Sequence, residues 1–193
     1  MQVRTTLTGT KGSALLLNNG RLADPDDPIV QAIKAITDRG KQMTDVDRKE
    51  VARLSYHGAM YGNGDGPAIP AVNLRRCFQD AAKMTKKGKQ IERALIPLSS
   101  EAAIDYKGPR DFAALWDSDK FIYRAMVRKG RGRVPSVRPS FRDWSLAVDW
   151  EMIETFLNLR DFKEIIDLAG VCIGLGDNRT NGFGRFTATV VKL

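Results

Sequence analysis

The sequence has one histidine and two cysteines among its 193 residues. Cys77 and Cys172 cannot form a disulfide framework, and no cysteine or histidine pair has the spacing of a zinc site. Since no disulfide framework is expected, we expect the protein in a reducing compartment, the cytoplasm. Since no metal-site spacing is present, we also expect it to hold no metal ion or other cofactor. The lone His57 has no nucleophile or carboxylate fixed near it in the sequence, and no catalytic residue is predicted.

Long apolar runs are also missing. The two most apolar stretches, residues 14–17 and 171–175, are far shorter than the roughly 20 residues that a membrane-spanning helix needs. The N-terminal residues, MQVRTTLTGTKG, contain no apolar segment of the kind found in a secretory signal. We therefore expect no membrane partner.

Positive charge is what the sequence has in excess. Lysine and arginine number 31 against 23 acidic residues, which gives a net charge of +8. Residues 75–93 carry seven basic and two acidic residues, and residues 128–142 carry six basic residues and no acidic one. Two basic blocks in the middle of the chain favour a polyanionic partner.

Hydrophobic periodicity predicts mixed α and β structure in a single domain, 1–193. Residues 3–8 and 144–150 alternate between apolar and polar side chains, which is typical of half-buried strands. Further strands are expected at residues 91–98, 102–106, 121–127, 171–175 and 185–192, and residues 56–61 could be another.

Helices are expected where apolar residues recur at helical spacing. The pattern predicts a helix at residues 28–38, one from residue 45 and one opened by Pro70. In the Pro70 helix, Arg75, Arg76 and Lys83 lie opposite the apolar stripe. A last helix is expected to stop at Gly170.

Residues 174–184 contain four glycines in eleven positions. Gly174, Gly176, Gly182 and Gly184 would let backbone N–H groups approach a phosphate closely, or would simply form a tight turn between two strands. Neither a dinucleotide-binding fingerprint nor a phosphate-binding P-loop is present. Arg179 and Arg185 could add charge there, and Phe183 could add a stacking face.

The basic segment 128–142 is interrupted by glycine and proline and is followed by aromatic residues. Phosphate contacts from its arginines and stacking on Phe141 would suit a single strand, whereas a solvated basic loop is the plainer interpretation. The basic face of the Pro70 helix has the same two interpretations. At its start, near Asn73, free N–H groups could meet a phosphate.

Three motifs together resemble the RAMP superfamily, which includes backbone and RNA-processing subunits of CRISPR effector complexes. They are GLGDNR with GFGRF (residues 174–186), IPAVNLRRCF (69–78) and VRPSFRDW (137–144). The three are also similar to a group of bacteriophage proteins that resemble stand-alone backbone-type RAMP proteins. The resemblance implies a ferredoxin-like (RRM-like) α+β core with a helical insertion at about 18–66. It also implies a basic β-hairpin extension at about 128–142.

We expect a non-enzymatic protein that binds single-stranded RNA or DNA, with RNA slightly preferred and little dependence on sequence. It would assemble side by side along the strand as a homo-oligomer or filament, in the host cytoplasm if it is phage-encoded. The alternatives are a protein-interaction module that binds a host or CRISPR component, and a ribonuclease. The candidate nucleic-acid-binding residues are Asn73, Arg75, Arg76, Lys83, Arg128, Arg131, Arg133, Arg138, Phe141, Arg142, Gly174, Gly176, Arg179, Gly182, Phe183, Gly184 and Arg185.

Overall fold

The computed structural model describes residues 1–62, 64–130 and 132–193, so the candidate Arg131 lies outside the described residues. The chain forms two compact units. The core unit comprises residues 1–15, 62–107 and 141–193, and the arm unit comprises residues 16–61 and 108–140. The predicted insertion and the predicted basic extension fall largely in the arm unit.

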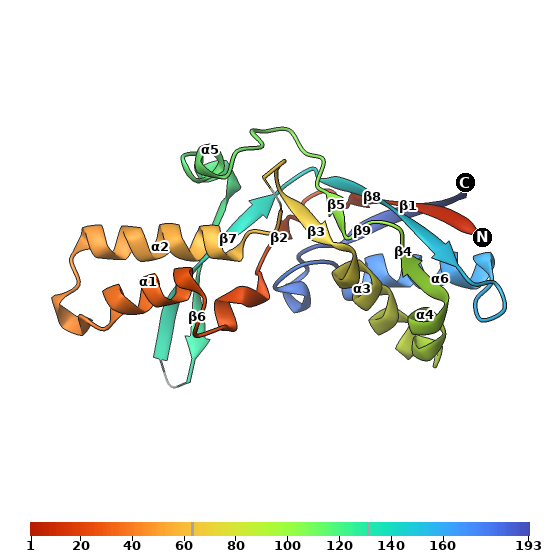
Figure 1. Ribbon diagram of the computed structural model, residues 1–193, viewed down its shortest axis with the longest axis horizontal. Coiled ribbons are helices and arrows are strands. Elements are labelled where there is room, and N and C mark those ends of the chain that lie inside the picture. Colours follow the sequence, from red (N-terminus) through yellow and green to blue (C-terminus); the bar gives the residue numbers. More distant parts are fainter. Residues whose placement is uncertain (63, 131) are drawn as a thin grey trace. The chain divides into compact units, whose positions relative to one another are not determined.

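A four-stranded antiparallel sheet forms the centre of the core unit (Figure 1). Its strands are β1 (Gln2–Gly9), β4 (Leu95–Pro97), β8 (Ser145–Met152) and β9 (Phe186–Lys192), in the order β4-β8-β1-β9. In β1, Val3, Thr5 and Leu7 are fully buried. The predicted alternation is therefore confirmed, because successive side chains of a strand point to opposite faces.

Helices α3 (Ala71–Met84), α4 (Gly88–Ala94) and α6 (Leu159–Leu168) belong to the same unit. The ring of Phe78 in α3 lies 5.8 Å from Trp150 of β8 and 6.1 Å from Phe162 of α6. Edge-on aromatic packing of this kind adds to the burial of apolar area. It joins both helices to the buried face of the sheet.

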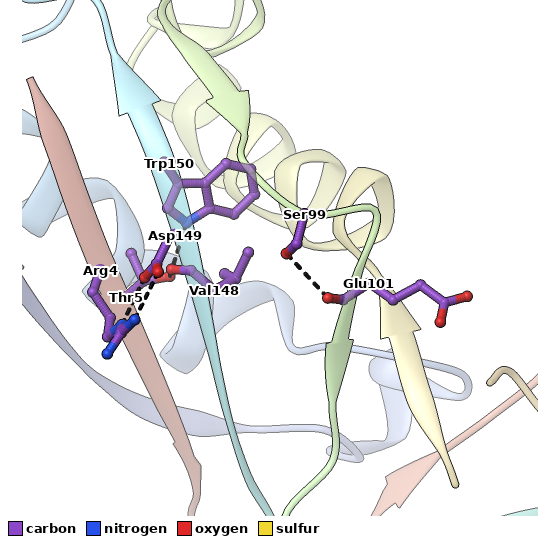
Figure 2. Close-up of polar contacts among 7 residues, drawn as sticks. All are labelled: Arg4, Thr5, Ser99, Glu101, Val148, Asp149 and Trp150. Atoms are coloured by element: carbon purple, nitrogen blue, oxygen red, sulfur yellow. Dashed lines mark hydrogen bonds and ion pairs between the residues drawn. The ribbon is translucent and has the colours of Figure 1, made fainter. Parts of the chain in front are cut away.

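Trp150 is buried together with its own polar partner. Its Nε1 donates to Thr5 Oγ1 at 2.9 Å, and the Thr5 hydroxyl donates to the Val148 carbonyl at 3.3 Å (Figure 2). On the opposite face, Arg4 pairs with Asp149 through two hydrogen bonds, at 2.6 and 2.7 Å. Leaving the buried indole N–H unsatisfied would cost about 1–3 kcal/mol, so Thr5 is a core residue despite its hydroxyl.

The arm unit contains α1 (Pro28–Thr37), α2 (Asp45–Ala59) and α5 (Phe112–Trp116). Asp27 caps α1 by accepting from the Ile29 N–H, and Thr44 and Asp47 form a capping box at the start of α2. These caps supply partners for the N–H groups that a helix start leaves unbonded.

Strands β6 (Ile122–Lys129) and β7 (Gly132–Phe141) form an antiparallel hairpin. It belongs to a three-stranded sheet of order β2-β7-β6, with β2 at Leu15–Leu16, and not to the core sheet.

The remaining elements are short. Strands β3 (Ala68–Pro70) and β5 (Glu101–Ala103) pair in the core unit. Single turns lie at Gly20–Ala23, Gly40–Gln42, Asp119–Phe121 and Arg179–Asn181.

Four sequence predictions are corrected. Residues 88–94 are helical where a strand was expected from residue 91, because Ile91 and Ala94 are buried at helical spacing. The expected strand at 102–106 is limited to Glu101–Ala103, and residues 56–59 complete α2. The expected buried strand at 171–175 is wrong: Ala169–Ile173 form a π-helical turn, and Val171 is 73% exposed.

Gly170 does not stop the last helix. It lies inside the π-helical turn, which ends where the Gly174 N–H donates to the Ala169 carbonyl at 2.8 Å. A Cβ at Gly170 would collide with the Phe186 carbonyl. The glycine is therefore needed for the close approach of this turn to β9, and not for a left-handed cap.

In the part of the chain that the structure describes, we find no helix with the length and apolar character needed to cross a membrane.

Candidate nucleic-acid interface

The glycine-rich loop connects the π-helical turn to β9, and its two ends hold each other. The Leu175 N–H donates to the Gly184 carbonyl at 2.8 Å, and the Gly184 N–H donates to the Ala14 carbonyl at 2.9 Å. A Cβ at Gly184 would collide with the Leu175 carbonyl, and one at Gly174 would lie 2.8 Å from the Phe183 carbonyl. These two buried glycines permit a tight turn, which is the structural one of the two interpretations.

The tip of the loop is different. Gly182 has a φ of 84° and an exposed position, and an added Cβ would meet no heavy atom within 4 Å. Gly176 also has a positive φ, 80°, and is exposed. Phe183 is half-buried. No described residue crowds Gly182, so only a bound partner could crowd this position.

Helix α3 and the loop meet at Asp80, a residue that the sequence analysis left unassigned. The Asp80 carboxylate lies 3.1 Å from Arg76 Nε, 2.9 Å from Lys83 Nζ and 3.8 Å from Arg179 Nη1. Arg76 and Lys83 reach it at helical spacings of four and three residues, whereas Arg179 comes from the loop. Three predicted cations are thus brought together, and they share one carboxylate.

A hollow of about 220 Å³ opens beside this cluster, lined by Asp80, Cys172, Ile173, Arg179, Thr180 and Arg185. Arg185 is held by its backbone N–H, which donates to Ser13 Oγ at 2.7 Å, and by its Nη2, which donates to the Arg179 carbonyl at 3.2 Å. Its Nη1 is buried and finds no hydrogen-bond partner in the described residues. A buried guanidinium N–H without a partner is costly. Arg185 also lines the hollow beside Arg179, so an anion there would meet two guanidinium groups.

The two cysteines have opposite environments. Cys77 is buried on α3 and its Sγ donates to the Gly174 carbonyl at 3.1 Å, whereas Cys172 is exposed and lines the hollow. Burial raises the pKa of the Cys77 thiol to about 12. Cys172 is exposed because residues 169–173 form a π-helical turn in place of the expected strand.

The start of α3 gives less support to a phosphate site than expected. The Ala71 N–H donates to the Ser100 carbonyl at 2.8 Å, so this amide is already used. Asn73 and Arg75 are half-buried. Arg75 makes no ion pair with any residue in the described ranges, so its charge is available.

The basic segment forms the end of the β6–β7 hairpin. Arg128 and Arg133 are exposed and lie directly opposite each other in the register. Like charges in that position destabilise an antiparallel pair. Neither arginine has an acidic partner among the residues that the structure describes. The described residues therefore leave the charge of these two arginines uncompensated.

The base of the hairpin offers fewer side chains for nucleic-acid binding than the sequence suggested. Phe141 is fully buried, with its ring 4.8 Å from that of Tyr106, so its predicted role as a stacking face is wrong. Arg138 is half-buried opposite Tyr123 and donates to the Val137 carbonyl at 3.2 Å. Arg142 is exposed. Phe141 and Trp144 are 0% and 1% exposed, so both aromatic residues at the end of the basic segment serve the core.

A second aromatic group was missed by the sequence analysis. Trp116 of α5 is half-buried, and the Arg124 guanidinium carbon lies 5.5 Å from the centre of its ring. The rings of Tyr56 and His57 lie 5.2 and 6.4 Å from Trp116. The pKa of His57 is lowered, first by burial and then by Arg53. In the sequence, the one sign of this aromatic group is the basic residue Arg124 within the otherwise apolar stretch of the predicted strand.

The sheet itself presents few features of a base-stacking surface. The face of β1 opposite the core carries Arg4, Thr6 and Thr8, and their neighbours in β9 are Val191, Thr189 and Thr187. These positions hold no aromatic ring, whereas RRM-type sheets stack bases on aromatic residues. In the described ranges, no three His, Cys, Asp or Glu residues gather as a metal site.

Comparisons with known proteins leave the family of the chain open. No protein-family model matches the sequence, and no curated protein matches it. Among solved structures, the chain is similar to Cmr6 from Pyrococcus furiosus. The identity is 12% and the TM-score is 0.36, over 100% of this chain and 98% of that chain. A likeness of this degree assigns the chain to no family.

Proposed function

We propose that the protein binds single-stranded nucleic acid through its backbone phosphates and does so without cleaving it. The observation that carries this proposal is the hollow beside Asp80, which is lined by Arg185, whose buried Nη1 has no hydrogen-bond partner among the described residues. Arg179 lines the same hollow from the glycine-rich loop. Charge-assisted hydrogen bonds from arginine to phosphate are short and strong, and a phosphate there would satisfy both guanidinium groups.

The second support is the distribution of charge around that hollow. Arg76, Lys83 and Arg179 all contact the single carboxylate of Asp80, so positive charge exceeds negative charge locally. Neutralising phosphates with such cations releases counterions and binds nucleic acid with little regard to sequence. We expect RNA to be slightly preferred, as the RAMP resemblance implies.

The proposal includes a ferredoxin-like core. Counting only the sheet strands and the helices that connect them, the chain runs β1, α3, β4, β8, α6, β9, with the sheet order β4-β8-β1-β9. Two β-α-β arrangements around one antiparallel sheet are the pattern of that fold. Since the open face lacks aromatic residues, we place binding at the loop and on the hairpin and not on the sheet.

Fluorescence anisotropy with a labelled, unstructured oligonucleotide tests the proposal. The Arg179→Ala variant should bind several-fold more weakly than wild type and melt at a similar temperature. Arg160→Ala is the matched control, because Arg160 is an exposed arginine in an ion pair with Glu164 on α6. Equal loss in both variants would indicate a general charge effect and would contradict a site at the loop.

The absence of cleavage has its own test. Labelled RNA incubated with the protein and Mg²⁺ or Mn²⁺ should remain intact on a denaturing gel. RNA that is cut by wild type but not by His57→Ala would replace this proposal with a nuclease. Side-by-side assembly is also proposed, and light scattering with and without a long single strand measures it.

A further inference from the structure

Trp116 differs from the other tryptophans of the chain in its exposure. The sequence contains three tryptophans, and Trp144 and Trp150 are 1% and 0% exposed. Trp116 ends the short helix α5 and is only half-buried. A large aromatic ring left in part to solvent is a feature of binding surfaces more than of cores.

The ring of Trp116 is held in a fixed environment. Tyr56 is fully buried against it at 5.2 Å, and the Tyr56 hydroxyl donates to the Phe121 carbonyl at 3.3 Å. Arg124 places its guanidinium group over the indole at 5.5 Å. Arg124 has no ion pair within the described part of the chain, so its planar group is held by the ring alone.

The same face of the hairpin continues this surface. Arg124, Met126 and Arg128 point to one side of β6 because they are two residues apart, and Arg133 shares that side opposite Arg128. Met126 is 59% exposed between the two arginines. Arg128 lies about 14 Å from Arg124 along the strand. Cations therefore alternate with an exposed apolar side chain along one face.

We propose that Trp116 and Arg124 form a stacking platform for one nucleobase of a bound single strand. The phosphates on one side of that base would follow Arg128 and Arg133 along the hairpin. This inference rests on the proposed function and assigns it a second contact region, in the arm unit. Bases stack on arginine planes and on aromatic rings whatever their sequence, which suits binding that is not sequence-specific.

The neighbouring charges favour one path for the strand. The charges beside His57 are mixed, because Asp111, Glu50 and Asp117 act on it together with Arg53, which pairs with Glu50. Arg128 and Arg133, by contrast, have no acidic partner among the described residues. The strand is therefore expected to leave Trp116 along the hairpin, where its phosphates meet these two arginines.

The partial exposure of Trp116 makes the test direct. Titrating the protein with an unlabelled oligo(U) or oligo(dT) should quench tryptophan emission, because a base stacked on an indole quenches it and the other two tryptophans are buried. Trp116→Phe should remove the quenching and keep most of the affinity. Trp116→Leu should weaken binding about tenfold. Arg124→Gln should also weaken binding, by a smaller factor.

Affinity is measured separately by anisotropy of a labelled strand, so the two proposals can fail independently. Binding without quenching in wild type overturns the platform and leaves the proposed function standing. So does a folded Trp116→Leu variant that binds like wild type. No binding by anisotropy overturns both. Quenching in wild type supports the platform even if Trp116→Leu is too unstable to study.

Discussion

The Sγ of Cys77 donates a hydrogen bond to the carbonyl oxygen of Gly174 at 3.1 Å, which joins helix α3 to the first residue of the glycine-rich loop. The sulfur is buried, and the loop returns to the helix again through Arg179 and Asp80. Two separate contacts thus fix the loop against α3. The arginines at the hollow are therefore positioned before any ligand arrives, which lowers the entropic cost of binding.

The first prediction concerns thiol reactivity. In the native protein, iodoacetamide should modify Cys172 and not Cys77, as measured by mass spectrometry of peptides. Cys172 is exposed, whereas burial holds the pKa of Cys77 at about 12 and keeps it protonated at ordinary pH. Both should react in denaturant. Bound single-stranded RNA should slow modification of Cys172, because this residue lines the hollow; equal native rates for both thiols would contradict the structure.

The second prediction separates the structural glycines from the loop tip. Gly184→Ala should lower the free energy of unfolding by well over 1 kcal/mol, since its φ is 67° and the new Cβ would collide with the Leu175 carbonyl. Gly182→Ala should cost only about 1 kcal/mol, because its φ of 84° is unfavourable but the space is open. Urea titrations of both variants measure this. Equal stabilities would argue against the loop geometry.

The third prediction concerns Asp80. Asp80→Asn should raise the affinity for single-stranded RNA several-fold and steepen its salt dependence, because Arg76, Lys83 and Arg179 lose their common carboxylate. Stability should change little, since exposed ion pairs contribute at most about 1 kcal/mol each.

The control for Asp80 is Asp149→Asn, which makes the same change of charge beside Arg4 on the open face of the sheet. It should leave affinity nearly unchanged. If both variants bind equally more tightly than wild type, net charge and not the hollow determines affinity.

The fourth prediction concerns the hairpin. The double variant Arg128→Ala/Arg133→Ala should bind more weakly yet melt at the same or a higher temperature, because removing opposed like charges relieves the strand pair. Arg48→Ala/Arg53→Ala removes the same charge from α2 and serves as the control, although its ion pairs with Asp45 and Glu50 are lost as well. A hairpin variant that melts far lower with unchanged binding would make these arginines structural.

The sequence was most informative where one pattern decides the structure. Alternation in residues 3–8 and 144–150 predicted β1 and β8, because a sheet with one buried face imposes that period. The apolar stripe from Leu74 to Ala82 predicted α3 for the equivalent reason. The prediction of a strand at residues 171–175 failed because a short apolar run does not distinguish a strand from a helical turn. The exposure of Val171 depends on tertiary contacts, which the sequence pattern does not show.

The candidate site was predicted in part for similar reasons. The composition of 75–93 and 174–185 indicated the cations near the hollow, but not that Asp80 would join them, since Arg179 is ninety-nine residues away in the chain. Trp116 and Arg124 were missed because their contact crosses from α5 to β6. Phe141 was assigned to the surface because neighbouring basic residues do not reveal which way a strand residue points.

The salt dependence of binding to a single-stranded oligonucleotide tests the central claim most directly. Anisotropy titrations across a range of salt concentrations give the slope of log K against log[salt]. With about four to six phosphates neutralised, the slope should be roughly −3 to −4 for a single strand. Binding that is the same at low and high salt, or no binding at low salt, would contradict the account.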